Sequence, residues 1–436
     1  MTSIQQREEV FGKTLYAYGQ PFFLNHTGKL IWDYYQAGQR PHEIIEGICS
    51  KFGVPVAEAT DDVVTFMAHL ARHRLVTYSP DTSLPKHGEG GQGIRALRRD
   101  IKSPLVVQWE LTHSCTNRCI FCHNPAYEPL TISDEHAKIV LEALISAGVF
   151  HITFTGGEPT LHPLLPELIS IATKAGVPTS IITNGNHIAA DGLTEMKKCG
   201  LSGVQVSLHS HDPQVHASLT ENTVSYKEAL SFIDRALALG LNPNVNTVIT
   251  SLNPHLNDVY RFVSSLGVRS YTLTRYIPTR PDLGYLERPF EQVKKELCDM
   301  VLTQIARVPI KLLTPFPLCA LTQSEMAVLR PIMAGCDGGD SWATISPSGY
   351  FKPCPTWDLN CGSIIQSELE PIWKTNANLQ AIRTGAFIPQ ECKICDLRST
   401  CSTGCRGCAL AASGSPSSFD PLVDLERVRE LRKCAE

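Results

Sequence analysis

The sequence lacks the features that would place a protein in a membrane or outside the cell. No apolar run approaches the roughly 18 residues of a membrane-spanning helix. The first ten residues, MTSIQQREEV, are polar and contain no apolar signal core. A large excess of charge of one sign is also lacking, because 39 Lys and Arg against 43 Asp and Glu leave a net charge of only -4. This excludes a nucleic-acid or anionic-membrane footprint built on net charge alone. We expect a cytoplasmic protein that binds neither nucleic acid nor a membrane.

Cysteine, in contrast, is abundant. The chain of 436 residues has 16 cysteines, and ten of them lie between Cys319 and Cys434. A secreted disulfide framework is normally a short chain with a signal peptide. Clustered cysteines in a long chain of this composition, 43% hydrophobic and 19% charged, favour metal binding in a globular protein of several domains.

The patterning divides the chain into four parts. Residues 1–80 predict a small winged-helix-like domain, with short β-type segments over 12–24. Residues 81–103 predict a linker, because Gly, Pro and Ser dominate its first half. Helical patterns in the small domain cover 27–37, 41–52 and 61–73.

Residues 104–310 alternate six strand patterns with helical ones. This alternation predicts an α/β fold, a partial (β/α)6 barrel with parallel strands and outer helices. Residues 311–436 contain only short Gly- and Cys-rich segments without long periodic elements, so we expect the cysteines to stabilise their fold. The expected strands are 105–111, 151–155, 178–183, 203–209, 243–250 and 270–276.

The first cysteine motif directly follows the first barrel strand. Cys115, Cys119 and Cys122 have the spacing C-x3-C-x2-C, at the carboxyl end of the barrel, where such folds place their chemistry. Three thiolates suit three irons of a [4Fe–4S] cluster and leave the fourth iron open. A structural zinc site needs four ligands, and His123 is the nearby candidate for a fourth.

The second motif, HITFTGGEP, ends the second barrel strand. Glycine lets the backbone approach a ligand closely, and a carboxylate can accept a hydrogen bond from an ammonium group. This motif and the cysteine motif, with its aromatic Phe121, resemble the signatures of the radical SAM superfamily. The glycine motif consists of Gly156, Gly157, Glu158 and Pro159.

The resemblance implies a cofactor and a reaction. S-adenosylmethionine would chelate the open iron, and reductive cleavage would yield methionine and a 5′-deoxyadenosyl radical that takes a hydrogen atom from substrate. The glycine motif would hold the methionyl amino group. Asn184 and Ser207 match weaker cofactor positions of the family. No catalytic acid or base is assigned; His123, His209 and Arg275 are expected at the mouth.

The C-terminal cysteines resemble the SPASM extension, which normally holds two auxiliary [4Fe–4S] clusters. The resemblance implies that three cysteines and an upstream Cys319 hold the first cluster. The last ligand of the second cluster departs from the pattern, because residues 418–426 contain no cysteine. Cys408 is preferred there over Cys434, Asp420, Asp424 or an open position. The implied sets are Cys336, Cys354 and Cys405 with Cys319, and Cys392, Cys395 and Cys401 with Cys408.

A zinc ribbon is the alternative for these cysteines. It would pair Cys392 and Cys395 with Cys401 and Cys405. The second pair has x3 rather than x2 spacing, and the upstream cysteines would have no role.

The pattern of residues 1–80 resembles the RiPP recognition element, a PqqD-like domain that binds leader peptides of ribosomally made precursors. The resemblance implies that a peptide adds as a strand near residues 20–24, against the last helix. The whole chain then resembles peptide maturases that form thioether or carbon–carbon cross-links, with a flavodoxin or ferredoxin-type electron donor. The alternatives are a SPASM enzyme acting on a tetrapyrrole, and a non-catalytic iron–sulfur carrier or zinc scaffold that would not cleave S-adenosylmethionine.

Overall fold

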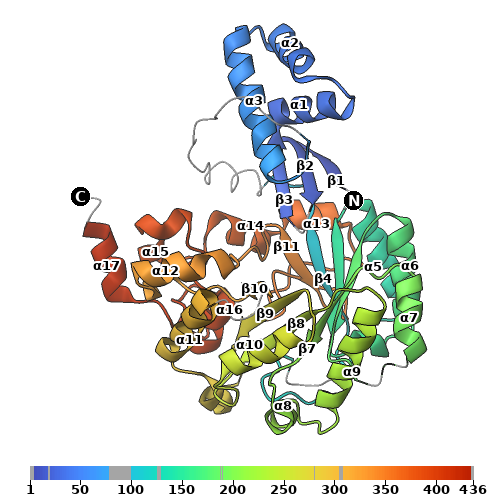
Figure 1. The fold of residues 1–436 in the computed structure, drawn as a ribbon, viewed down its shortest axis with the longest axis vertical. Helices are drawn as coiled ribbons and strands as arrows, with labels where there is room; N and C mark the ends of the chain where they lie inside the picture. The colour runs from blue at the N-terminus through green and yellow to red at the C-terminus, as the bar shows by residue number, and fades with distance from the viewer. Residues whose placement is uncertain are drawn as a thin grey trace. The chain divides into compact units, whose positions relative to one another are not determined.

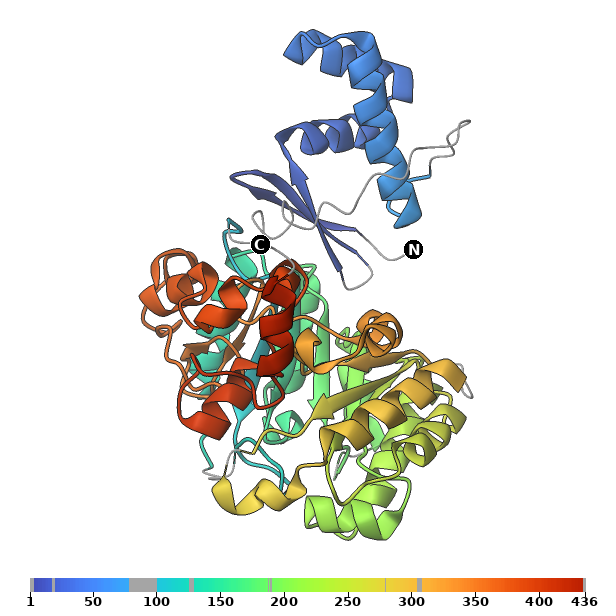
Figure 2. The same cartoon turned by 90° about the vertical axis from the view of Figure 1, so that its left-hand side faces the viewer.

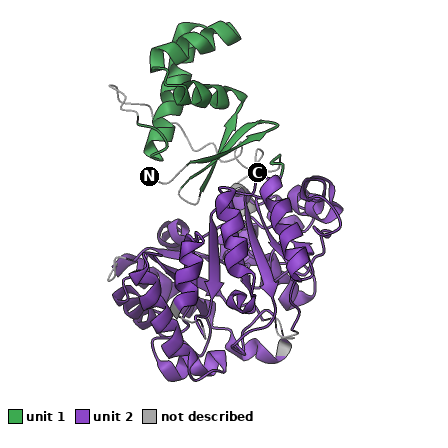
Figure 3. Cartoon of the chain, turned by 90° about the vertical axis from the view of Figure 1, so that its right-hand side faces the viewer, with its two compact units in different colours: residues 1–102 green, residues 103–436 purple. Residues whose placement is uncertain are grey.

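The chain divides into two compact units, Met1–Lys102 and Ser103–Glu436 (Figure 3). Most of the predicted linker, up to residue 99, lies outside the described part. No helix of the described part is long and apolar enough to cross a membrane. The computed structural model describes residues 4–17, 20–77, 100–124, 129–186, 188, 190–278, 280–303 and 308–433.

The first unit is an antiparallel sheet in the order β1-β2-β3, followed by three helices. In the described residues β3 pairs with β2 alone, so its other side is an edge. Pro21 in β3 fits an edge position, because proline cannot donate to a ladder. The elements are β1 (Gln5–Glu9), β2 (Gly12–Ala17), β3 (Gln20–Asn25), α1 (His26–Gln36), α2 (Pro41–Phe52) and α3 (Val56–Arg72).

Local signals and one shared core explain these elements. Asn25 caps α1 by accepting a hydrogen bond from Gly28 N, and Gly53 ends α2 at a φ of 68°. Helix α3 begins five residues before the expected position, because Ala59 extends its buried face by a turn. Strand β1 was not predicted. The core includes Leu15, Ile31, Trp32, Ile44 and Met67.

The second unit contains a nine-stranded sheet in the order β10-β9-β8-β7-β6-β5-β4-β11-β12. Strands β4 to β9 are parallel and adjacent in chain order, which confirms the predicted α/β fold. Their bounds are β4 (Val106–Thr112), β5 (His151–Gly156), β6 (Thr179–Thr183), β7 (Gly203–Ser207), β8 (Asn244–Ile249) and β9 (Ser270–Arg275).

Helices cover the outside of this curved sheet (Figures 1 and 2). Apolar and polar residues alternate along the strands, so one strand face is apolar, and side chains such as Trp109, Phe154 and Tyr271 are fully buried. The helices are α5 (Asp134–Ser146), α6 (Leu165–Lys174), α7 (Ala190–Lys198), α8 (Pro213–Thr220), α9 (Ser225–Ala238), α10 (Leu256–Ser265) and α11 (Phe290–Thr303).

Residues after 309 extend this same sheet, which the sequence did not indicate. Strand β10 (Ile310–Leu312) is parallel to β9, β11 (Trp342–Ile345) is parallel to β4, and β12 (Phe351–Lys352) is antiparallel to β11. The cysteine-rich region is thereby fixed to the first barrel strand. Its helices are α12 (Gln323–Leu329), α13 (Leu369–Thr375), α14 (Ala377–Thr384), α15 (Gln390–Lys393), α16 (Arg406–Ser413) and α17 (Leu425–Lys433).

Candidate functional site

The three-cysteine loop, residues 115–122, follows the carboxyl end of β4. Backbone N–H groups point at two of its sulfurs: Asn117 N lies 3.4 Å from Cys115 Sγ, and Asn124 N lies 3.4 Å from Cys122 Sγ. Burial raises the pKa of Cys115 to about 11. A thiol of that kind is neutral until a metal displaces its proton, so the loop is arranged for thiolate ligands that form on metal binding.

The two glycines of the GGEP motif are required by the loop's own backbone. Gly157 N donates to Thr112 O at 2.6 Å, and Glu158 N donates to Ser114 O at 2.8 Å. A Cβ at Gly156 would lie 2.1 Å from Thr112 O, and one at Gly157 would lie 2.2 Å from Ser114 O. The motif therefore binds the segment that leads into Cys115, a role that the sequence did not indicate.

The Glu158 carboxylate is fully buried and already has four donors within the chain. Its Oε1 accepts from Thr160 Oγ1, Thr160 N and Thr183 Oγ1, and its Oε2 accepts from Asn184 N at 2.8 Å. The expectation that this carboxylate also receives a ligand's ammonium group stays a prediction, and Oε2, with one donor in the chain, keeps an acceptor site for it. The four donors join the GGEP turn to the end of β6, because an unpaired buried carboxylate would be costly.

Amides that follow β6 hold the cysteine loop. Asn184 Nδ2 donates to Thr116 Oγ1 at 2.9 Å and lies 3.5 Å from Cys115 Sγ. Asn186 Nδ2 donates to Asn117 Oδ1, which also accepts from Asn222 Nδ2. The sequence pointed to Asn184 but missed Asn117, Asn186 and Asn222, because nothing in their spacing links them.

The remaining cofactor candidates have different places. Phe121 packs edge-on against the His209 ring at 4.6 Å and joins a cluster that contains Tyr276. Ser207 ends β7 in register with Asn246. Pro159 begins a short 3-10 helix, Pro159–Leu161. Phe121 thus has a packing role. Among the described residues, no hydrogen bond of the Ser207 side chain indicates a function for it.

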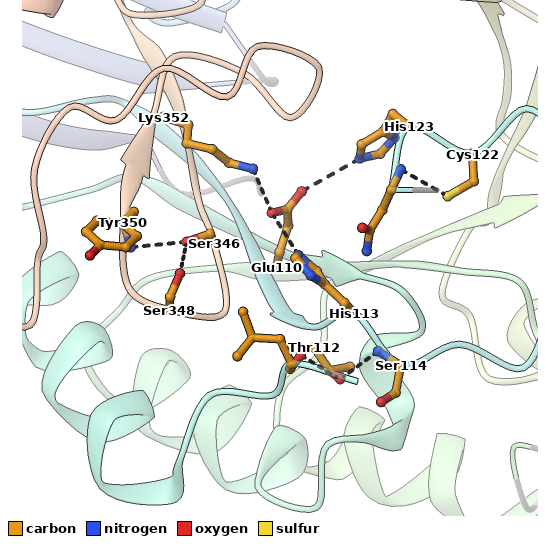
Figure 4. A network of polar contacts seen from close by, with 12 residues as sticks. Glu110, Thr112, His113, Ser114, Cys122, His123, Ser346, Ser348, Tyr350 and Lys352 are labelled. Atoms are coloured by element: carbon orange, nitrogen blue, oxygen red, sulfur yellow. Dashed lines mark hydrogen bonds and ion pairs between the residues drawn. The ribbon is translucent and has the colours of Figure 1, made fainter. Parts of the chain in front are cut away.

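Figure 4 shows a charged network beside the loop, centred on Glu110 of β4. Lys352 Nζ of β12 lies 3.1 Å from Glu110 Oε2, and both side chains are less than a tenth exposed. His113 Nε2 and His123 Nε2 lie 3.8 and 3.7 Å from the same carboxylate. Burial alone would raise the pKa of Glu110, but the histidines and Lys352 hold it well below its usual range. The sequence indicated neither Glu110 nor Lys352.

Four cysteines of the C-terminal region line one pocket. Cys401 Sγ accepts from Leu318 N at 3.4 Å and from Thr403 N at 3.3 Å. No three described His, Cys, Asp or Glu side chains converge closely enough for one metal ion; the thiols of a cubane cluster bind different irons and lie farther apart. This set, named the Cys319 group, is Cys319, Cys392, Cys395 and Cys401.

A second set, named the Cys405 group, comprises Cys336, Cys354, Cys405 and Cys408. The charges of Cys405 and Cys354 act on Cys336, and the charge of Cys405 acts on Cys354. The Cys408 thiol hydrogen-bonds to Cys405 and lowers its pKa. Cys405 caps α16 and Cys408 follows it by three residues, so one helical turn brings them together.

The implied division of ligands is therefore corrected. Cys319, expected with Cys336, Cys354 and Cys405, lies in the other set, because its 3-10 turn Leu318–Ala320 contacts Cys401. Cys408, expected beside Cys392, Cys395 and Cys401, lies with Cys405. A zinc ribbon of Cys392, Cys395, Cys401 and Cys405 does not form, because Cys405 belongs to the other set.

The two aspartates considered as ligands have other roles. Both Asp420 carboxylate oxygens accept from Arg275 Nη1. The Asp424 carboxylate accepts from Arg427 N at the start of α17, and its backbone N–H faces Cys319. Cys434 lies outside the described residues.

Comparisons with known proteins identify three domains. The family model for the Radical SAM superfamily matches residues 109–262, that for coenzyme PQQ synthesis protein D (PqqD) matches 13–76, and that for the SPASM iron-sulfur cluster-binding domain matches 336–408. The domains account for one cluster that binds S-adenosylmethionine and for auxiliary clusters. The cysteines of the loop and of both groups fit these cofactors, since each set places soft sulfur ligands together.

Individual relatives agree with this assignment. The AdoMet-dependent heme synthase of Oleidesulfovibrio alaskensis is 24% identical over 357 residues, 75% of this chain and 89% of the relative. The PqqA peptide cyclase of Bradyrhizobium diazoefficiens is 26% identical over 353 residues, 75% of this chain and 88% of the relative. Streptococcus suis SuiB, crystallised with the precursor peptide SuiA, has the same fold, with a TM-score of 0.68 at 16% identity, covering 98% of this chain and all of SuiB. The chain is thus a radical SAM enzyme that carries a PqqD-like domain before its barrel and a SPASM domain after it.

Proposed function

We propose that this enzyme cross-links a ribosomally made precursor peptide. The observation that carries the proposal is the PqqD-like unit on the same chain as the radical SAM and SPASM domains. SuiB is crystallised with a precursor peptide, and the PqqA peptide cyclases are named for a peptide. The bond is a thioether or a carbon–carbon bond, and each bond removes two hydrogens from the peptide.

The residues of the chain bind and orient the reactants. Cys115, Cys119 and Cys122 hold the cluster that chelates S-adenosylmethionine, and the Cys319 and Cys405 groups hold the auxiliary clusters. When bound, S-adenosylmethionine and its cluster would supply the radical that takes one hydrogen atom from a peptide carbon; the second hydrogen would leave as a proton, and its electron would pass to an auxiliary cluster. A flavodoxin or ferredoxin-type protein supplies the electron.

The precursor's leader segment binds at the outer edge of β3. This edge has no strand partner among the described residues, and such an edge can accept an extended peptide through backbone hydrogen bonds. Phe22 of β3 packs edge-on against His73, which follows α3, at 5.0 Å. Side chains between β3 and α3 then provide specificity.

The test is the mass of a candidate peptide. A short peptide encoded beside the gene is co-expressed without oxygen with the enzyme and iron–sulfur assembly proteins. We expect a loss of two hydrogens per bond, located by fragmentation, and no loss with the variant in which Cys115, Cys119 and Cys122 are all Ala. Phe22→Ser should weaken leader binding, whereas Phe52→Ser, an exposed phenylalanine of α2, should not.

The heme synthase relative favours a second candidate, a tetrapyrrole substrate. The PqqD-like unit argues against it, because a small-molecule enzyme has little use for a leader-binding domain. Formation of 5′-deoxyadenosine with an unchanged peptide, together with conversion of a supplied tetrapyrrole, would overturn the peptide proposal.

A further inference from the structure

A buried ion pair lies beside the Cys405 group. Arg275, the last residue of β9, donates from Nη1 to Asp420 Oδ1 and Oδ2 at 2.9 and 3.0 Å. The Arg275 side chain is 12% exposed and the Asp420 side chain is not exposed at all. The pair therefore acts in a region that screens charge weakly.

Asp420 is bonded directly to the backbone of a cluster ligand. Its Oδ2 accepts from Cys405 N at 2.7 Å, and its Oδ1 accepts from Leu422 N at 2.9 Å. The close approach requires Gly404, where a Cβ would lie 2.6 Å from the Asp420 side chain. The position of the aspartate is therefore fixed by the turn that carries Cys405.

The Arg275 charge also acts on the sulfurs. Burial alone would lower the pKa of Arg275, but the charges of Cys408, Asp420 and Cys405 raise it. The same interaction must stabilise negative charge on these two sulfurs. Arg275 is not among the main causes of the raised pKa of Cys319 or of Cys392 in the other group.

We propose that Arg275 and Asp420 set the reduction potential of the cluster held by the Cys405 group, with opposite effects. Reduction adds a negative charge to the cluster, so the nearby guanidinium favours the reduced form and the carboxylate opposes it. The proposal rests on the ligand set proposed above and holds equally for a peptide or a tetrapyrrole substrate. Arg275 and Asp420 are positioning residues here, not catalytic ones.

The test is a potentiometric titration followed by electron paramagnetic resonance. It uses the full chain with Cys115, Cys119 and Cys122 changed to Ala, so that only auxiliary clusters contribute signals. We expect Arg275→Gln to disfavour reduction of one cluster about tenfold, a shift of about 59 mV for one electron. Asp420→Asn should shift the same cluster the other way. Arg275→Lys should stay close to the parent, and the Cys319-group cluster should not move.

A double variant keeps the test valid if Arg275→Gln loses iron. Arg275→Gln with Asp420→Asn leaves no unpaired buried charge, and comparison with Asp420→Asn alone isolates the arginine. We expect the double variant to be reduced about tenfold less readily than Asp420→Asn. Equal potentials, or equal shifts of both auxiliary clusters, would overturn the proposal. A shifted signal that survives Cys405→Ala would instead refute the ligand assignment.

Discussion

The three-cysteine loop and the two C-terminal cysteine groups build sulfur sites in opposite ways. The loop takes all its sulfurs from eight consecutive residues, 115–122. The Cys405 group draws on residues from 336 to 408 and the Cys319 group on residues from 319 to 401, so their chain segments interleave. Spacing alone therefore defines the first site. In the C-terminal region spacing identifies the ligands but not their division.

The contrast between the three-cysteine loop and the C-terminal groups is tested most directly by removing one sulfur from each kind of site. Cys119→Ala should lower 5′-deoxyadenosine formation on the order of a thousandfold, because the loop has no spare thiol. Cys395→Ala in the Cys319 group should leave this cleavage within about tenfold of the parent. Both rates are measured by chromatography of the reduced enzyme with S-adenosylmethionine, and Cys199→Ala, on a cysteine outside all three sites, serves as control. Equal losses in both variants would show that the sites are not independent.

The second test concerns the backbone beneath the loop. Gly157→Ala would place a Cβ 2.2 Å from Ser114 O, so the loop must move, and a displacement of about 1 Å can cost roughly a hundredfold in rate. Cleavage rate and iron content are measured together. Gly203→Ala is the matched control, since its nearest atom is Ser180 Cβ at 3.5 Å. Normal cleavage by Gly157→Ala would contradict the assigned role of the motif.

The ion pair of Glu110 and Lys352 links the two kinds of sulfur site, because it joins β4, which leads into the three-cysteine loop, to the strand just before Cys354. Lys352→Met should lower the free energy of unfolding by up to about 3 kcal/mol, because the buried carboxylate loses its lysine and keeps only the two histidines. Replacing Glu110 by Gln as well should restore part of this loss. Denaturant unfolding of the two variants measures both effects. Equal stability of Lys352→Met and the parent would show that the ion pair does not stabilise the fold.

The same pair predicts a dependence on pH. The pKa of Glu110 is lowered in the folded state, so the stability it provides is present above the unfolded pKa of about 4.3 and is lost as pH falls through the folded value. The difference in stability between the parent and Glu110→Gln should therefore narrow below about pH 4. A constant difference down to pH 3 would argue against an ionised Glu110.

The smallest expected effect comes from one amide beside the loop. Asn184→Ala removes the hydrogen bond from Nδ2 to Thr116 Oγ1 and the contact with Cys115 Sγ. One such bond contributes about 1 kcal/mol, so we expect the KM for S-adenosylmethionine to rise about fivefold. Asn378→Ala, which removes an exposed hydrogen bond to Asn360 O, should leave KM unchanged.

Periodicity predicted much of the fold, and the missed elements share a cause. The six barrel strands follow apolar runs between helical patterns, and β4 to β9 match them closely. Strands β10, β11 and β12 have only two to four residues, too few for a recognisable period. Their place in the sheet depends on β4 and β9, which are distant in sequence.

Among the site residues, the sequence found those within local motifs. Cys115, Cys119 and Cys122 have a fixed spacing, whereas Glu110 and Lys352 are 242 residues apart and form a pair only in the folded chain. The sequence placed Arg275 at the mouth, but not its partner Asp420, 145 residues away.

The sequence by itself determined the order of the domains, the parallel barrel and the cysteines available as ligands, because periodicity and short spacings are local properties. The tertiary structure alone decided the grouping of the auxiliary cysteines, the tie between the GGEP turn and the loop, and the two buried ion pairs. These features depend on which distant segments share a low-dielectric interior, where a misplaced charge or an unpaired polar group is costly.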